Sequence, residues 1–116
     1  MAKIHILQEK ATPQQIAELL ESFNDQRMIK IVVDIKRKIL AGGSGMHFEC
    51  EQLLLKEGSS QEDLWGANWF PDEQEIEFES LINARGLINR SIVLQDPELR
   101  QAVEDITREY LGGVTL

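Results

Sequence analysis

The sequence predicts an α+β fold of two layers, in which a mostly antiparallel sheet carries two helices packed on one face. Residues 28–40 alternate between apolar and polar side chains, which is the pattern of a half-buried strand. Residues 12–23 and 96–110 carry apolar side chains at helical spacing behind a capping residue. Two amphipathic helices need one sheet face to cover, so the expected order is β-α-β-β-β-β-α.

The first strand and the first helix lie close to the start of the sequence. Residues 3–7 are predicted to form a short strand. Thr12 suits the N-cap of the helix that follows, Pro13 suits its first position, and Gln15 completes a capping box. The expected buried stripe of this helix is Ile16, Leu19, Leu20 and Phe23. The helix is expected to end at Asn24, Asp25 and Gln26.

The long strand over residues 28–40 is expected to end at a glycine-rich bend over residues 42–45. Its predicted buried side chains are Ile31, Val33 and Ile35, while Lys30, Lys36 and Lys38 face water or a partner. Apolar side chains on its other face would then remain uncovered. This partly open face is predicted to include Val32, Leu40, Leu64 and Phe70.

Residues 46–51 also alternate and are predicted to form the strand after the bend. A helix competes with this interpretation, because Met46, Cys50, Leu53 and Leu54 also fit a helical stripe. Strand pairing favours the strand, since Lys38 would lie opposite Glu49 and Lys36 opposite Glu51. The change of phase at Gln52 then indicates a β-bulge.

A hairpin and a final helix complete the predicted fold. Residues 64–70 and 75–82 alternate, and a loop at Asp72 and Glu73 would place Trp69 opposite Ile76 and Ala67 opposite Phe78. A polar loop spans residues 83–91. The expected parts of the last helix are the cap Asp96, the first-turn Pro97, the stripe Leu99, Val103, Ile106 and Tyr110, and the stop at Gly112 and Gly113.

The composition limits the classes of function. The 116 residues predict a single domain over 1–116. A net charge of −8 disfavours nucleic acid as a partner, and no apolar run is long enough to cross a membrane. A single cysteine and the absence of a signal peptide predict a reducing, cytoplasmic location. No cofactor is expected.

Residues 41–51, Ala-Gly-Gly-Ser-Gly-Met-His-Phe-Glu-Cys-Glu, carry a resemblance to a known family. With residues 58–66 and 77–83, this run resembles a family of small bacterial proteins, many of them cyanobacterial, classed only as a domain of unknown function. The resemblance covers most of the chain from Met28 to the last helix. It implies no activity, cofactor or catalytic residue. Phe48 and Glu49 stand where the family pattern suggests a small residue and an aspartate, which disfavours a dense carboxylate site.

The first candidate site is the cluster His47, Glu49, Cys50 and Glu51. On a strand, His47, Glu49 and Glu51 share a face that could hold a divalent ion, but the chain lacks a second His/Cys cluster, so no metal site is predicted. Cys50 as a nucleophile fails with His47, because their side chains leave opposite faces. His5 is an alternative partner that nothing places nearby, and a buried core thiol is the simpler interpretation.

The second candidate site is the polar loop. Its arginines and amides suit an anion or a carboxylate ligand, although the same groups can equally hold the loop in place. The candidate ligand-binding residues are Asn83, Arg85, Asn89, Arg90 and Ser91.

Three functions remain open from the sequence. The leading hypothesis is a non-enzymatic protein-interaction module that self-associates through the open sheet face. Its expected partner is a second copy of the chain in a homodimer, or another protein. An alternative is a small hydrolase or anion-binding enzyme that uses His47 with Glu49 or Glu51 and with Arg85 or Arg90. A third is an acidic, antitoxin-like or regulatory partner of a basic protein.

Overall fold

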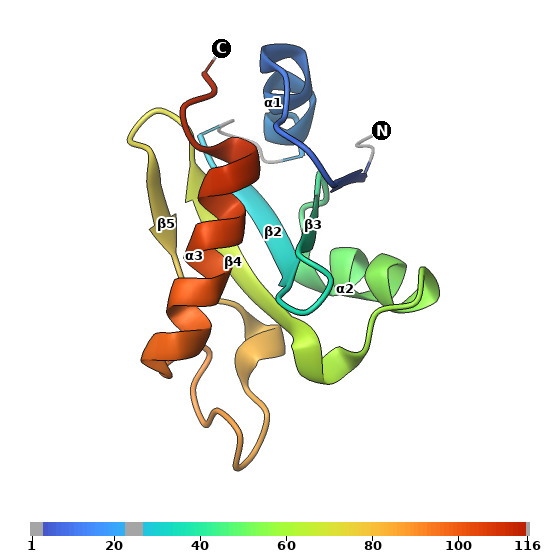
Figure 1. The fold of residues 1–116 in the computed structure, drawn as a ribbon, viewed down its shortest axis with the longest axis vertical. Helices are drawn as coiled ribbons and strands as arrows, with labels where there is room; N and C mark the ends of the chain where they lie inside the picture. The colour runs from blue at the N-terminus through green and yellow to red at the C-terminus, as the bar shows by residue number, and fades with distance from the viewer. Residues whose placement is uncertain (1–3, 23–26, 116) are drawn as a thin grey trace.

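A computed structural model describes residues 4–22 and 27–115. Five strands form one antiparallel sheet in the order β1-β3-β2-β4-β5 (Figure 1). The strands are β1 (His5–Leu7), β2 (Ile29–Asp34), β3 (Ile39–Gly42), β4 (Leu64–Phe70) and β5 (Glu75–Glu77). The helices are α1 (Pro13–Leu20), α2 (His47–Lys56) and α3 (Pro97–Leu111), with short 3₁₀ turns η1 (Gln61–Asp63) and η2 (Leu81–Asn83).

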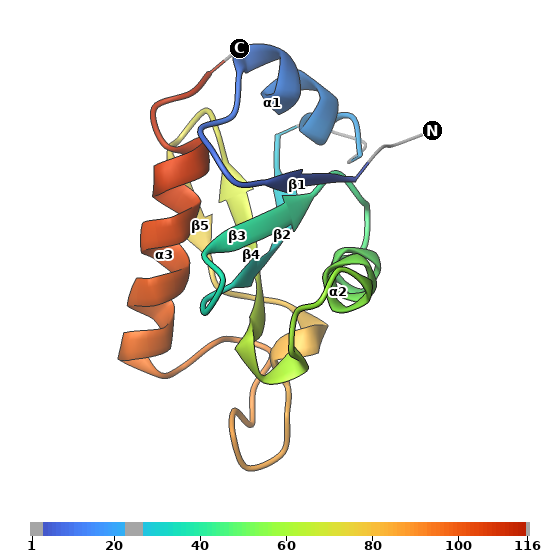
Figure 2. The same ribbon diagram turned by 45° about the vertical axis from the view of Figure 1, so that its right-hand side comes forward.

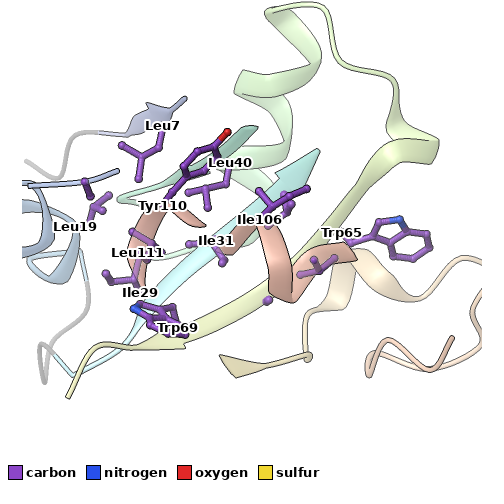
Figure 3. Close-up of a cluster of buried hydrophobic side chains, with 14 of the residues drawn as sticks. Leu7, Leu19, Ile29, Ile31, Leu40, Trp65, Trp69, Ile106, Tyr110 and Leu111 are labelled. Carbon is purple, nitrogen blue, oxygen red and sulfur yellow. The ribbon is translucent and has the colours of Figure 1, made fainter. Parts of the chain in front are cut away.

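Helices cover both faces of the sheet. Helices α1 and α3 pack on one face, which confirms the predicted α+β fold, and α2 covers part of the opposite face as a further layer (Figure 2). Figure 3 shows side chains of the larger core, including Ile29, Ile31 and Trp69 of the sheet with Ile106 and Leu111 of α3. The smaller core under α2 contains Val32, Ile39, Ala41, Cys50, Leu54 and Leu64.

Several predicted elements are confirmed at the level of single contacts. Thr12 and Gln15 form the capping box, with backbone-to-side-chain bonds of 3.1 and 2.9 Å. The Asp96 carboxylate caps α3 by accepting from the backbone N–H of Glu98 at 2.8 Å. Strand β4 has the predicted bounds, and Trp69 lies opposite Ile76 as expected. Local signals with a defined chemistry were therefore reliable.

The prediction of one strand over residues 28–40 is wrong, because a turn divides this segment into β2 and β3. The Asp34 carboxylate accepts from the backbone N–H groups of Lys36 at 2.9 Å and Arg37 at 2.8 Å. Lys38 takes a positive φ of 57° and donates its N–H to the Asp34 carbonyl oxygen at 2.9 Å. A side chain that bonds its own following backbone favours a turn over a continuous ladder.

The prediction of a strand over residues 46–51 is also wrong, and the competing helix is the observed structure. Gly42 belongs to β3, and the chain leaves the sheet at Gly43, whose φ is 106°. His47, Cys50, Glu51 and Leu54 are the buried residues of α2, at helical spacing. The predicted Lys38–Glu49 and Lys36–Glu51 strand pairs and the bulge at Gln52 do not exist.

The open apolar sheet face is not observed. Val32 and Leu64 are buried under α2, and Leu40 is buried in the larger core instead. Phe70 is half-buried. On the predicted buried face, Ile31 and Val33 are fully buried and Ile35 is half-buried. Lys36 and Lys38 are exposed, as predicted, whereas Lys30 is half-buried.

Strand β5 is shorter than the predicted range 75–82, because the chain bends away after Glu77. Residues 78–80 pair instead with residues 92–94, through Ser80 N–H to the Ile92 carbonyl at 2.9 Å and Leu94 N–H to the Phe78 carbonyl at 2.8 Å. Ile82 therefore packs against the smaller core rather than beside Phe78.

Five predicted positions, Lys3, Phe23 and the helix-ending residues 24–26, lie outside the described residues. Across residues 4–22 and 27–115, no helix combines the length and the apolar character that a bilayer crossing requires.

Candidate functional groove

A groove of about 440 Å³ lies where the first turn of α2 meets β4, β5 and the segment after β5. The residues that line it come from segments far apart in the sequence, so tertiary structure creates it. Its floor is polar and its rim is apolar. The lining residues are Met28, Lys30, Met46, His47, Phe48, Asn68, Glu77, Glu79, Ser80, Leu81, Ile82 and Ile92.

His47 is the one member of the predicted His/Glu/Cys cluster that lines this groove. It opens α2, where the turn of the helix directs its side chain against β4. Its Nε2 lies 2.9 Å from the Ala67 carbonyl oxygen, and because a carbonyl accepts only, Nε2 carries a proton. Burial lowers the pKa of His47, although the bond to Ala67 opposes this shift. The ring is therefore neutral near pH 7, with Nδ1 as an acceptor.

Asn68 supplies a second acceptor on the floor. Its side chain is 6% exposed, and its Nδ2 donates to Glu77 Oε1 at 3.0 Å and to the Glu79 carbonyl oxygen at 3.2 Å. Its Oδ1 is buried, and the Asn68 side chain lies close enough to the His47 ring to oppose the lowering of the His47 pKa by burial. The groove lining thus presents acceptors on its floor together with the exposed carboxylates of Glu77 and Glu79, offset by the ammonium group of Lys30.

The rim carries large apolar side chains in water. The exposed fractions are 57% for Met46, 53% for Phe48, 80% for Leu81 and 37% for Ile92. Single exposed apolar residues are common on protein surfaces, but a cluster around one concave site marks a binding surface. We call these four residues the groove rim.

The other members of the predicted catalytic cluster point elsewhere. Cys50 lies on the inner side of α2 and is fully buried in the smaller core. Burial raises the pKa of its thiol to about 12, so it is not a thiolate near neutral pH. Glu49 accepts a hydrogen bond from the Ser44 hydroxyl at the start of the helix. Glu51 is buried, with its Oε2 3.9 Å from a guanidinium nitrogen of Arg85.

The structure uses the predicted ligand-binding loop residues to hold the loop itself. Asn83 bonds both backbone groups of Gly66, at 2.8 and 3.0 Å. The Asn89 side chain donates to three backbone carbonyls, those of Asn83, Ser91 and Val93. The Ser91 hydroxyl accepts from the Val93 N–H at 3.0 Å. The hydrogen-bonding groups of these side chains are occupied by backbone groups of the protein and are not available to a ligand.

Arg85 ties the same loop to the sheet. Its guanidinium donates to the carbonyl oxygens of Gln61, Leu64 and Ile82. It also lies over the Trp65 ring, 4.1 Å from the ring centroid. Burial lowers the pKa of Arg85, and the nearby Glu51 carboxylate opposes that shift. Arg85 is a structural cation in this position.

The tip of the loop is apolar and exposed, whereas its base is polar and buried. Leu87 and Ile88 are 86% and 67% exposed. A tight turn holds them, with Arg85 N–H bonded to the Asn89 carbonyl at 2.7 Å and Gly86 at a φ of 56°. Arg90 follows the tip and is exposed, and none of the ion pairs found in the described residues includes it.

Sequence reasoning missed most of the groove. Asn68 sits inside a strand, where asparagine is uncommon, and this was a signal for a buried polar site. The rim residues gave no such signal, because Met46, Phe48 and Leu81 were placed on predicted strands and Ile92 was assigned to no element. The part of the chain that the structure describes has no group of three His, Cys, Asp or Glu side chains placed to hold a metal ion.

Comparison with known proteins gives a family and no function. A search among curated proteins and a search among solved structures found no significant match. A family model described as "Protein of unknown function (DUF5674)" matches residues 5–110, which include every strand and helix apart from the last residue of α3. The chain therefore belongs to the DUF5674 family, a family of proteins of unknown function.

Proposed function

We propose that this protein is a non-enzymatic protein-interaction module that self-associates through the groove and its rim. One observation carries the proposal: four large apolar side chains, Met46, Phe48, Leu81 and Ile92, stand in water around one groove. Burying a large apolar side chain contributes about 1.5–3 kcal/mol. A partner that covers the rim would recover this free energy.

The surroundings of the rim favour a protein partner. The apolar side chains come from the start of α2, from η2 and from the segment that follows the loop, so segments distant in the sequence contribute to one rim. The groove floor adds acceptors at its centre, which suits a side chain inserted from a partner surface. Interfaces typically combine such apolar anchors with a few placed polar groups.

The enzyme alternative has less support. It requires His47, a glutamate and an arginine to line one cleft. The groove contains His47 but none of Glu49, Glu51, Arg85 and Arg90, and Glu51 and Arg85 interact with each other beneath the surface. Cys50 is buried as a thiol.

The test is sedimentation velocity of the purified protein over a concentration series. We expect a reversible dimer that Phe48→Glu weakens by about tenfold or more, because the change places a charge in the interface core. The matched control is Gln52→Glu, which adds the same charge to an exposed position of the same helix. A strict monomer at every concentration, or equal effects of the two variants, would overturn the proposal.

A further inference from the structure

We infer that the groove of one copy takes the loop tip of a second copy, with Leu87 and Ile88 against the groove rim and Arg90 at the carboxylates of Glu77 and Glu79. This inference rests on the proposed function and names the surface that fills the groove. Both halves of the contact lie on this chain, so no other protein is needed to complete it.

The base of the loop is fixed in a way that presents the loop tip to solvent. Side chains of Asn83, Arg85 and Asn89 hold its base through bonds to backbone carbonyls. A segment that is fixed before binding loses less conformational entropy when it docks. Buried polar side chains thus hold the loop so that two apolar side chains, Leu87 and Ile88, lie in water and not in the core.

The loop tip and the groove have complementary chemistry. The tip offers two branched apolar side chains followed by an exposed guanidinium, that of Arg90. The groove offers apolar walls and two carboxylates against one ammonium, so its lining has a net charge of −1 with His47 neutral. The buried Oδ1 of Asn68 adds a further acceptor to the lining.

The loop leads directly into residues 92–94, and Ile92 of this segment belongs to the groove rim. A loop and a groove that adjoin on one surface can be exchanged reciprocally across a two-fold axis, which gives a closed dimer. A chain with a net charge of −8 repels its own copies, so a local pair of opposite charges favours one orientation over others.

A charge exchange tests the inference in sedimentation velocity. We expect Arg90→Glu and Glu79→Lys each to raise the dimer dissociation constant by about tenfold or more, since each places like charges together. An equimolar mixture of the two variants should recover the dimer, because every loop then meets a groove of opposite charge. The double variant Arg90→Glu/Glu79→Lys should dimerise alone for the same reason.

Control variants carry the same charge changes at exposed positions outside the groove. Lys36→Glu matches Arg90→Glu, and Glu75→Lys on β5 matches Glu79→Lys. Thermal melts of all variants check that they fold, and Arg90→Gln serves as a milder variant. The apolar half is tested by Leu87→Ser/Ile88→Ser, which should also weaken the dimer by tenfold or more without lowering the melting temperature.

The outcomes separate this inference from the proposed function. If Phe48→Glu dissociates the dimer while the changes at Arg90, Leu87 and Ile88 have no effect, the groove binds another surface and this inference fails alone. Loss of the dimer in each charge variant without recovery in the mixture also overturns it. A wild-type monomer overturns the proposed function and this inference together.

Discussion

The two faces of the sheet differ in size and in chemistry. Among the described residues, the face under α1 and α3 holds eighteen buried apolar residues, and the face under α2 holds six. Buried polar side chains gather on the α2 side instead, where His47, Glu51 and Asn68 lie beside the small core. The larger face stabilises the fold, whereas the α2 face combines limited packing with the groove.

The difference in polarity between the two faces shows where a small domain can hold a binding site. The larger core consists of apolar side chains, and a polar group buried there costs free energy unless it finds a hydrogen-bond partner. The α2 face accepts polar groups because backbone carbonyls and neighbouring side chains satisfy them, as Ala67 does for His47 and Gly66 for Asn83. The groove forms at the margin of this polar layer.

The largest expected effect is on the α1/α3 face. Val33→Asp places an unpaired carboxylate among fully buried apolar side chains, which costs several kcal/mol and approaches the whole stability of a small domain. We expect no cooperative melt in circular dichroism. The control Lys36→Ala alters an exposed turn residue and should change stability by about 0.5 kcal/mol or less. A folded Val33→Asp variant would show that this face is not the main core.

The same contrast explains what the sequence could predict. On the α1/α3 face, side chains repeat with clear periods in the stripe Leu99, Val103, Ile106 and Tyr110 and in the strand residues Ile31, Val33, Trp65 and Trp69. Both helices, strand β4 and this part of the core were therefore predicted correctly, although the division of residues 28–40 into two strands was not. Caps at Thr12 and Asp96 fixed the helix starts, because their chemistry is local.

Elements on the α2 side were predicted less well, because their signals depend on tertiary contacts. Residues 46–54 fit both a strand period and a helical stripe, and the buried His47 and Glu51 look like surface residues until Ala67 and Arg85 are placed against them. The turn at Asp34 was missed because the apolar positions Ile31, Val33 and Ile35 continue the strand period past it. The groove joins five segments, and no local pattern reports such convergence.

On the α2 face, Arg85→Met should have the largest effect. It leaves the Glu51 carboxylate buried without its cation and three backbone carbonyls without a donor, which we expect to cost about 3 kcal/mol or more. Urea denaturation measures the loss. The double variant Arg85→Met/Glu51→Leu should recover part of it, because it removes the buried charge. Additive losses would show that Glu51 and Arg85 are not energetically coupled.

Gly66→Ala tests the close approach of β4 to the segment after β5. A Cβ at Gly66 would lie 2.5 Å from the Ser80 Cβ and 2.6 Å from its Oγ, so the backbone or Ser80 must move. We expect a loss of about 1–3 kcal/mol in urea denaturation. Ser80→Gly in the same chain should recover most of it. If Gly66→Ala alone is neutral, this side of the sheet is looser than the packed face.

The smallest effect concerns His47 and pH. Its pKa is lowered by burial, whereas the unfolded chain has the ordinary value of about 6.5, so the unfolded state binds more protons as the pH falls below that value. Stability contributed by the neutral ring is therefore complete above pH 6.5 and falls towards acid, by at most about 1.4 kcal/mol per pH unit.

His47→Gln keeps a donor for the Ala67 carbonyl and should flatten this part of the stability profile between pH 7 and pH 5. His5→Gln, a change on the edge strand β1, is the control and should leave the His47 contribution intact. If the stability of His47→Gln falls towards acid as steeply as that of the wild type, the carboxylates and not the groove histidine set the acid sensitivity of the α2 face.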